Sequence, residues 1–161
     1  QAGGKGISAL LESSLRSPSQ ILVVEDDPVI ADMLEELLTG AGYRVQSVPD
    51  VISALSALER NPIDLITLDL ELGTYSGNGL LALLKADART RKIPVIVVSS
   101  CQVGPEVRRL AEHVLSKPFN IAPFLQAIRA SLRARAAGGE AWLNGASDDS
   151  LQLEVSREVL D

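Results

Sequence analysis

The chain has 161 residues, of which 46% are hydrophobic and 22% are charged, with a formal net charge of −6. This composition predicts one globular domain rather than a disordered chain. A single cysteine and a single histidine exclude a disulfide framework, a cysteine-based zinc site and any site that needs two histidines. No apolar run approaches the ~18 residues of a membrane span and no signal-peptide pattern is visible, so we expect a cytoplasmic protein.

The charge is unevenly distributed along the chain. Residues 20–87 contain 12 acidic and 3 basic residues, residues 88–137 contain 2 acidic and 9 basic, and residues 138–161 contain 6 acidic and 1 basic. The net acidity argues against direct nucleic-acid binding. The opposite signs of the two central segments indicate that they serve different roles.

Strand and helix patterns alternate from residue 20 onward. Short apolar runs predict strands at residues 21–24, 44–48, 65–68, 93–98 and 114–115. Apolar residues at helical spacing predict helices at residues 28–38, 52–58, 80–86, 106–112 and 121–136. Continuously apolar strands that alternate with helices predict a doubly wound α/β fold, with a five-stranded parallel sheet covered by helices on both faces.

Two segments flank this α/β pattern. Residues 1–19 carry apolar side chains near helical spacing, which predicts a linker helix that ends before Pro18. Residues 138–161 form an acidic tail, which is either disordered or carries a strand around residues 151–155. The expected organisation is therefore a linker helix, one domain over residues 20–137, and the tail.

Polar side chains follow the predicted strands at their carboxyl ends. They are Glu25 and Asp26 after the first strand, Asp69 after the third, Ser99 and Ser100 after the fourth, and Lys117 after the fifth. Ligand sites of open parallel sheets lie beyond the carboxyl ends of the strands. We therefore expect these side chains to converge in one site.

Three carboxylates in such a site repel one another. At a separation of about 4 Å and an effective dielectric constant of about 20, each pair costs about 4 kcal/mol, so the cluster requires a cation or raised pKa values. Oxygen ligands favour a hard ion such as Mg²⁺. A carboxylate, Mg²⁺, a lysine and a hydroxyl are the groups needed to transfer a phosphoryl group onto an aspartate. Asp69, alone at the end of the central strand, is the best candidate for the acceptor.

Four stretches within residues 20–137 resemble the receiver domain of bacterial two-component response regulators. They are ILVVEDDP at residues 21–28, DLITLD at 64–69, IPVIVVSS at 93–100 and SKPF at 116–119. The resemblance implies a flavodoxin-like sheet with strand order 2-1-3-4-5. It also implies a signalling module rather than an enzyme, phosphorylated in a Mg²⁺-dependent phosphorelay by a histidine kinase or a phosphotransfer protein.

The resemblance further implies roles for individual residues. The phosphoryl site would comprise Asp69 as the phosphoacceptor, the Ser99 hydroxyl, the Ser100 N–H and Lys117. Mg²⁺ would be held by Glu25, Asp26, Asp69 and the backbone carbonyl of Glu71. The Lys117–Pro118 peptide bond would be cis, as it is in the family.

The segment between Ser99 and Lys117 departs from the family pattern. It is shorter than usual, and Val114 stands where the family has an aromatic residue. We therefore expect a shortened helix there and a muted conformational response to phosphorylation. The loop after Asp69 departs as well, because it is longer than usual and lacks the customary proline.

Basic residues gather on the last two predicted helices. They are Arg108, Arg109, Arg129, Arg133 and Arg135. Together with the fifth strand, these fourth and fifth helices of the domain would form the signalling face. Its basic side chains are either simply solvated or bind an acidic output partner or the chain's own tail. No membrane partner is expected.

Two other interpretations stay open. The chain could be a receiver module of a hybrid histidine kinase or of a longer regulator. It could instead be a phosphatase of the haloacid-dehalogenase type, because DLELGT at residues 69–74 faintly resembles the Asp-x-Asp-x-Thr motif of that family. Glu71 at the second acidic position and the lack of room for a cap domain count against the phosphatase.

Overall fold

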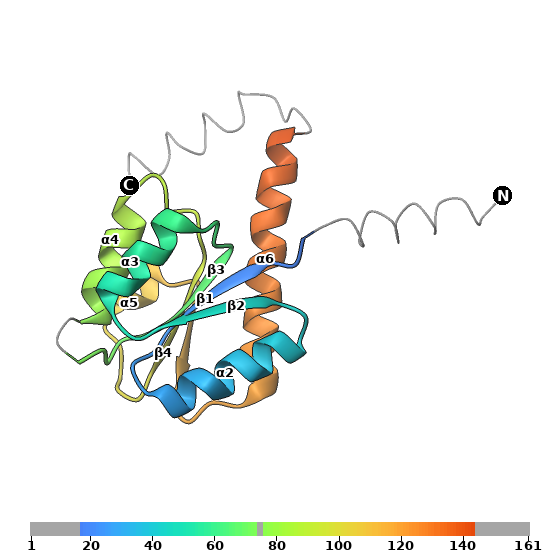
Figure 1. The fold of residues 1–161 in the computed structure, drawn as a ribbon. Coiled ribbons are helices and arrows are strands. Elements are labelled where there is room, and N and C mark those ends of the chain that lie inside the picture. Colours follow the sequence, from blue (N-terminus) through green and yellow to red (C-terminus); the bar gives the residue numbers. More distant parts are fainter. Residues whose placement is uncertain (1–16, 74–75, 144–161) are drawn as a thin grey trace.

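The computed structural model describes residues 17–73 and 76–143, which form a parallel sheet between two layers of helices (Figure 1). The strands are β1 (Gln20–Val24), β2 (Arg44–Val48), β3 (Leu65–Asp69), β4 (Val95–Ser99) and β5 (His113–Ser116). The helices are α2 (Pro28–Gly40), α3 (Val51–Arg60), α4 (Gly77–Ala86), α5 (Pro105–Leu110) and α6 (Ile121–Leu143). All strand pairs are parallel and the order is β2-β1-β3-β4-β5, so the predicted fold is confirmed.

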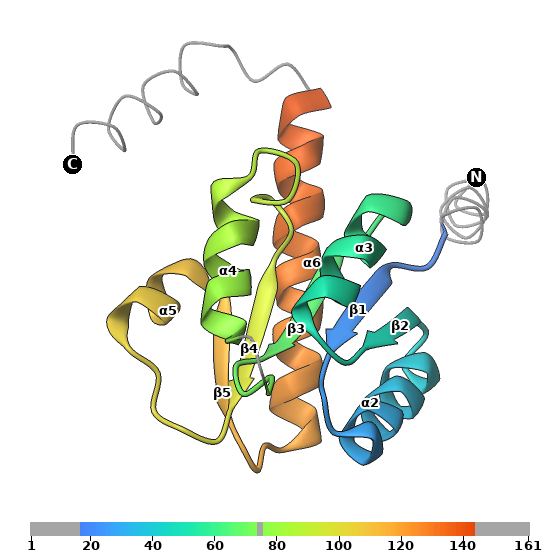
Figure 2. The same ribbon diagram turned by 60° about the vertical axis from the view of Figure 1, so that its left-hand side comes forward.

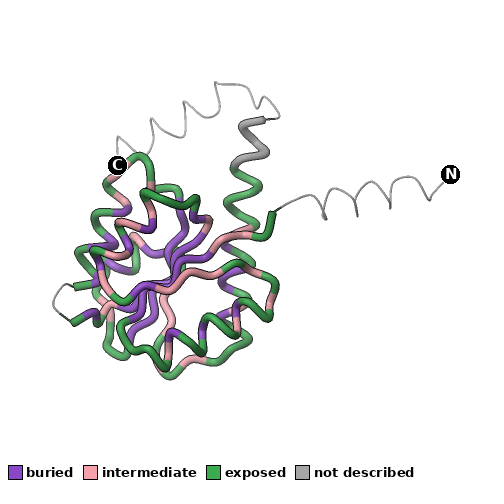
Figure 3. The backbone as a smooth tube through the Cα atoms, in the orientation of Figure 1, coloured by how far each residue is buried: buried purple, intermediate pink, exposed green. Residues whose placement is uncertain are grey.

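Each face of the sheet is buried by its own set of helices (Figure 2). On one face, Ile21 of β1 belongs to an apolar cluster with Leu38 of α2 and Phe124 of α6. On the other face, Leu22 belongs to a second cluster with buried residues of α3, α4 and α5. The central strands are therefore covered on both sides (Figure 3), which explains why their sequences are continuously apolar instead of alternating.

Side chains cap the helices that follow the strands. Asp27 accepts hydrogen bonds from the backbone N–H groups of Val29 and Ile30 at the start of α2. Asp50 caps α3 and Ser76 caps α4 in the same manner. Each cap satisfies N–H groups that have no partner within the helix. The Asp27 cap also fixes the point at which the chain turns out of β1.

All five helices differ in length from their predictions, and the reason is clear for α4 and α6. Helix α4 begins at Gly77 rather than at residue 80, because Ser76 provides its cap. Helix α6 continues to Leu143, beyond the predicted end at residue 136, because glycine costs only about 1 kcal/mol in a helix interior. Helix α5 contains six residues and is short, as predicted. Most of the predicted linker helix and the tail beyond residue 143 lie outside the described residues.

A membrane span is not found in the described part of the chain, where no helix is both long enough and apolar enough to cross a bilayer.

At the amino end of the sheet, Lys85 of α4 joins three segments. Its ammonium donates to the carbonyl oxygens of Arg91 at 3.3 Å and Ile93 at 2.9 Å, and to Glu112 Oε1 at 2.8 Å. The second carboxylate oxygen of Glu112 accepts a hydrogen bond from the backbone N–H of Val95. The Lys85 side chain is only 11% exposed, so protein groups replace most of its contact with water.

We expect Lys85→Met to lower the free energy of unfolding by about 2 kcal/mol, because two carbonyls and a carboxylate lose a charged donor. Urea denaturation would measure the change. Lys92→Met is the matched control, since Lys92 is exposed and has no hydrogen bond within residues 17–73 and 76–143. The control should change stability by less than about 0.5 kcal/mol, and equal effects of the two substitutions would contradict the assignment.

Candidate functional site

The sheet topology opens a crevice at the carboxyl ends of β1 and β3. The chain leaves β1 into α2 on one face of the sheet, whereas it leaves β3 towards α4 on the opposite face (Figure 2). The connections that follow these two neighbouring strands therefore run to opposite faces of the sheet. Doubly wound sheets bind ligands at such a switch point, so the crevice is the first place to look for a site.

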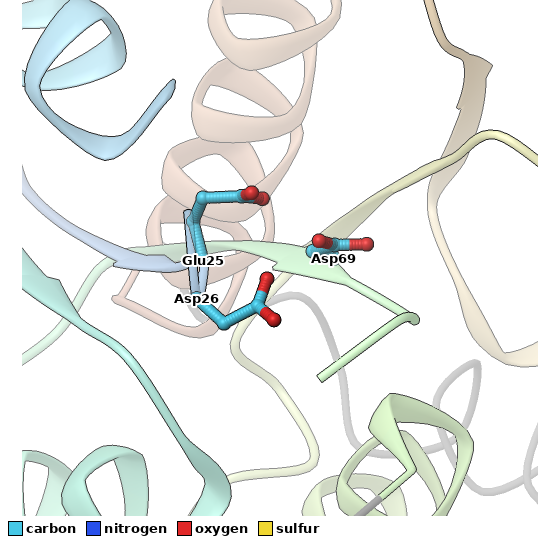
Figure 4. Close-up of side chains that lie close together, drawn as sticks. All are labelled: Glu25, Asp26 and Asp69. Carbon is cyan, nitrogen blue, oxygen red and sulfur yellow. The ribbon is translucent and has the colours of Figure 1, made fainter. Parts of the chain in front are cut away.

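Three carboxylates converge in this crevice (Figure 4). Glu25 and Asp26 follow β1, and Asp69 is the last residue of β3. Each contributes an oxygen that lies within 4.8 Å of the other two. Glu25 and Asp69 are 4% and 3% exposed, whereas Asp26 is exposed. The structure thus brings together the acidic residues that the sequence places at two different strand ends.

Lys117 supplies the positive charge opposite these carboxylates. Its Nζ atom lies 3.2 Å from Asp69 Oδ2 and 3.4 Å from Glu25 Oε2. Its backbone N–H donates to the Ser99 carbonyl oxygen at 2.8 Å, which extends the β4–β5 pairing and fixes the lysine. Burial lowers the pKa of Lys117, but the hydrogen bond with Asp69 and the charge of Glu25 outweigh burial and leave the pKa above its ordinary value. The lysine therefore stays protonated.

The negative charge in the cluster exceeds what one lysine neutralises. Burial raises the pKa of Glu25 to about 7, and Asp69 adds to this through a hydrogen bond and its charge, against the attraction of Lys117. The Oε1 atom of Glu25 is buried and has no hydrogen-bond partner among the described residues. A buried oxygen without a partner is costly. A hard divalent cation with oxygen ligands would satisfy it, so the donor set fits Mg²⁺.

The serines after β4 contact the side chain of Glu71. Ser99 Oγ donates to Glu71 Oε1 at 3.1 Å, and the Ser100 N–H donates to the same oxygen at 3.1 Å. Ser100 Oγ donates to Glu71 Oε2 at 2.6 Å. The hydrogen bond from the Ser100 hydroxyl is the main cause of a lowered pKa for Glu71, so this carboxylate is ionised at neutral pH.

The sequence analysis assigned only the backbone carbonyl of Glu71 to the site and missed its carboxylate. The backbone N–H of Glu71 donates to Asp69 Oδ1 at 2.9 Å, which forms a tight turn directly after β3. This turn brings the carboxylate within reach of the neighbouring strand end. The signal available in the sequence was an acid two residues after one strand, with two serines at the end of the next.

The structure also describes the remaining predicted features. The Lys117–Pro118 peptide bond is cis, as the resemblance implied. Val114 of β5 is half-buried. The five arginines predicted on the last two helices are all exposed, namely Arg108 and Arg109 on α5 and Arg129, Arg133 and Arg135 on α6. Of these, Arg135 also donates to the carbonyl oxygens of Ile63 at 3.2 Å and Asp64 at 2.6 Å, so its guanidinium binds the segment before β3.

An apolar groove of about 740 Å³ opens beside the site, between α2 and the segment that follows β5. Its apolar lining consists of Ile30, Met33, Leu37, Pro118, Phe119 and Ile121. Lys117 and Ser100 also line it, so the groove is continuous with the crevice. Met33 is 53% exposed and Ile121 is 56% exposed, which leaves apolar surface in contact with water.

Helix α4 begins directly against the backbone after β3. The N–H of Gly77 donates to the Leu70 carbonyl oxygen at 3.1 Å. A β-carbon on Gly77 would lie 2.5 Å from the Asp69 carbonyl oxygen and 2.6 Å from the Leu70 Cα atom. Both atoms belong to the backbone and cannot move aside cheaply. Glycine is therefore required here by close approach, and the contact holds the start of α4 against Asp69 and Leu70.

Comparison with known families finds one match that covers most of the domain. Residues 21–129 match the family model described as response regulator receiver domain. This match includes the three carboxylates, the two serines and the lysine described above.

Curated relatives share this region. The chain is 35% identical over 118 residues to a DNA-binding dual master transcriptional regulator, RpaA, of Synechocystis sp., covering 71% of this chain and 49% of that protein. It is 33% identical over 153 residues to the sensory transduction protein RegX3 of Mycolicibacterium smegmatis, covering 88% of this chain and 64% of that protein. The chain thus spans between about half and two thirds of the length of these two relatives.

Among solved structures, the receiver domain of a sensor histidine kinase from Pseudomonas aeruginosa PAO1 superposes with a TM-score of 0.65 at 28% identity. The match covers 72% of this chain and 98% of that domain. That structure has a magnesium ion coordinated in its active-site cleft.

We expect Gly77→Ala to lower the free energy of unfolding by about 2 kcal/mol, because the new methyl group forces the backbone at Asp69 and Leu70 to shift. Gly79→Ala is the matched control, since a β-carbon there meets nothing within 4 Å. Within a helix, the control should raise stability by up to about 1 kcal/mol. Urea denaturation would separate the two, and stabilisation by both substitutions would refute the close-approach argument.

Proposed function

Because this chain belongs to the family of response regulator receiver domains, we propose that Asp69 accepts a phosphoryl group from a histidine kinase or a phosphotransfer protein. The main support for the proposal is the environment of the Asp69 carboxylate. This carboxylate is 3% exposed at the end of β3, receives a hydrogen bond from Lys117 at 3.2 Å, and lies beside two further acids. A buried carboxylate held by a lysine beside a cation site is suited to nucleophilic attack on phosphorus.

In the proposed transfer, a carboxylate oxygen of Asp69 forms a bond to phosphorus as the P–N bond of a phosphohistidine breaks. The electron pair of the broken bond stays on the imidazole nitrogen. Lys117 neutralises charge on the phosphoryl oxygens, and the Ser99 hydroxyl and the Ser100 N–H donate hydrogen bonds to them. Mg²⁺, when bound, supplies further charge neutralisation at these oxygens. The residues that would hold it are Glu25, Asp26, Asp69 and the backbone carbonyl of Glu71.

The donor would dock on the apolar groove defined above. The groove is continuous with the crevice through Lys117 and Ser100, so a protein that presents a phosphohistidine to Asp69 would also cover this surface.

We propose that the exchange takes place in the cytoplasm. The unit that carries it would be residues 20–137, with residues 1–19 as a linker and residues 138–161 as an acidic tail. Such a unit serves equally well in a longer regulator or in a hybrid histidine kinase.

The signalling face would be formed by α5, β5 and α6. Phosphorylation adds about −1.5 to −2 elementary charges, and this change would act on Ser99 and Lys117, which precede α5 and α6. The exposed arginines of α5 and α6 favour an acidic partner, either a separate protein or the chain's own tail. The six-residue α5 and the small side chain of Val114 support a muted response.

Incubation with acetyl phosphate and Mg²⁺ should add one phosphoryl group to the wild-type chain, detected by intact-protein mass spectrometry. Asp69→Ala and Asp69→Asn should abolish the added mass because no nucleophile remains. Asp32→Asn, at an exposed position on α2, is the matched control and should be phosphorylated like the wild type. Labelling that persists in both Asp69 variants would refute the assignment, and steady turnover of p-nitrophenyl phosphate would favour the phosphatase interpretation.

Mg²⁺ should stabilise the protein, because it relieves repulsion among three carboxylates in the folded state only. At a Mg²⁺ concentration ten times the dissociation constant, the gain in unfolding free energy is about 1.4 kcal/mol. Asp26→Asn should reduce the Mg²⁺-induced rise in melting temperature, whereas Asp32→Asn should keep it. An equal rise in the two variants would place the cation elsewhere.

A further inference from the structure

The Glu71 carboxylate occupies donors that the phosphoryl site would use. The Ser99 hydroxyl and the Ser100 N–H both point to Glu71 Oε1, each at 3.1 Å. These are the two groups, besides Lys117, that the proposed function assigns to the phosphoryl oxygens. The third contact, from the Ser100 hydroxyl to Glu71 Oε2 at 2.6 Å, holds the other carboxylate oxygen. An anion of this protein therefore already sits on hydrogen-bond donors suited to an anionic ligand.

Glu71 is exposed, and its backbone is anchored at the end of β3. Its N–H binds Asp69 Oδ1 at 2.9 Å, so the residue is anchored to the proposed nucleophile itself. Ser99, its partner across the site, is 3% exposed and belongs to the buried strand β4. The contact thus joins the segment after β3 to the end of β4, where Ser99 is held by the sheet.

Glu71 and a phosphoryl group cannot use these donors together. A serine hydroxyl and a backbone N–H each carry one hydrogen, so each makes one strong hydrogen bond at a time. Two anions at hydrogen-bond distance from the same donors also repel each other. Phosphorylation of Asp69 therefore requires that the Glu71 carboxylate leave the serines.

We propose that Glu71 is an internal competitor of the phosphoryl group, which holds Ser99 and Ser100 in the unphosphorylated protein and is displaced when Asp69 is phosphorylated. This inference rests on the proposed function of Asp69. Glu71 is a positioning residue, because it sets how readily the donors become available. The apparent affinity of the site for a phosphoryl group equals its intrinsic affinity multiplied by the fraction of time that the carboxylate is away. A contact formed nine-tenths of the time lowers this affinity about tenfold.

The test is a titration of the full 161-residue chain with beryllofluoride, an anionic mimic of the phosphoryl group that needs no phosphodonor, in the presence of Mg²⁺. Isothermal titration calorimetry measures the dissociation constant. Glu71→Ala should tighten binding about tenfold, and Glu71→Gln should tighten it at least threefold, because the neutral amide accepts hydrogen bonds less strongly. Glu71→Asp should resemble Glu71→Ala, because its side chain is too short to span both serines.

Two further variants separate competition from general effects of charge and stability. Glu35→Gln removes the same charge from an exposed position on α2 and should leave the dissociation constant unchanged. Ser100→Ala removes the 2.6 Å contact and should tighten binding in the wild-type background but not in Glu71→Ala. Urea denaturation of each variant reports whether the change in affinity is accompanied by a change in stability, which competition does not require.

The outcomes distinguish failure of this inference from failure of the proposed function. Wild-type binding of beryllofluoride that is lost in Asp69→Asn, together with tighter binding by the Glu71 variants, supports both. If the wild type binds and Glu71→Ala binds equally or more weakly, the competitor is refuted while the function of Asp69 stands. Equal tightening by Glu35→Gln also refutes it. Absence of wild-type binding overturns the proposed function and the inference with it.

Discussion

Two buried carboxylates share a single lysine, and the arrangement of the whole site depends on this ion-pair network. Asp69 and Glu25 are almost completely removed from water, and Lys117 lies 3.2 Å and 3.4 Å from them. The three residues follow three different strands, β1, β3 and β5. The network can form only if the strands end at the same edge of the sheet. The site therefore depends on the fold, because the sheet places two carboxylates that repel each other beside the lysine that attracts both.

The packing around the crevice preserves this alignment. Gly77 allows α4 to lie directly on the backbone of Asp69 and Leu70, which fixes the end of β3. The backbone N–H of Lys117 continues the hydrogen bonding between β4 and β5 past the strand ends. At the opposite end of the sheet, Lys85 and Glu112 tie α4 to the segments before β4 and β5. These contacts thus fix the carboxyl end of β3 and both ends of β4 and β5.

The site contains one group of side chains that suits a cation and another that suits an anion. The carboxylates of Glu25, Asp26 and Asp69 form a cluster that suits a divalent cation, whereas Lys117 and the serine donors suit an anion. Glu71 belongs to the second group of contacts, because its carboxylate satisfies the serine donors while its backbone is bound to Asp69. A signalling domain needs two states of similar free energy, and exchange of one anion for another on the same donors keeps the difference between the states small.

The sequence by itself determined the order of strands and helices and the residues at the strand ends. LITLD at residues 65–69 is apolar up to Asp69 except for Thr67, and such a pattern follows from burial of a strand on both faces. Asp69, Lys117 and the two serines could be predicted for the same reason, because parallel strands end at one edge.

The tertiary structure alone decided which distant segments face one another. The carboxylate of Glu71 accepts a hydrogen bond from Ser99, 28 residues away in the sequence. The guanidinium of Arg135 donates to the carbonyl oxygens of Ile63 and Asp64. Gly77 and Lys85 gained their roles from contacts with backbone atoms of other segments. Periodicity reports whether a side chain is buried, but it carries no information about its partner. Which residue a buried side chain contacts depends on the packing of elements that are separated in the chain.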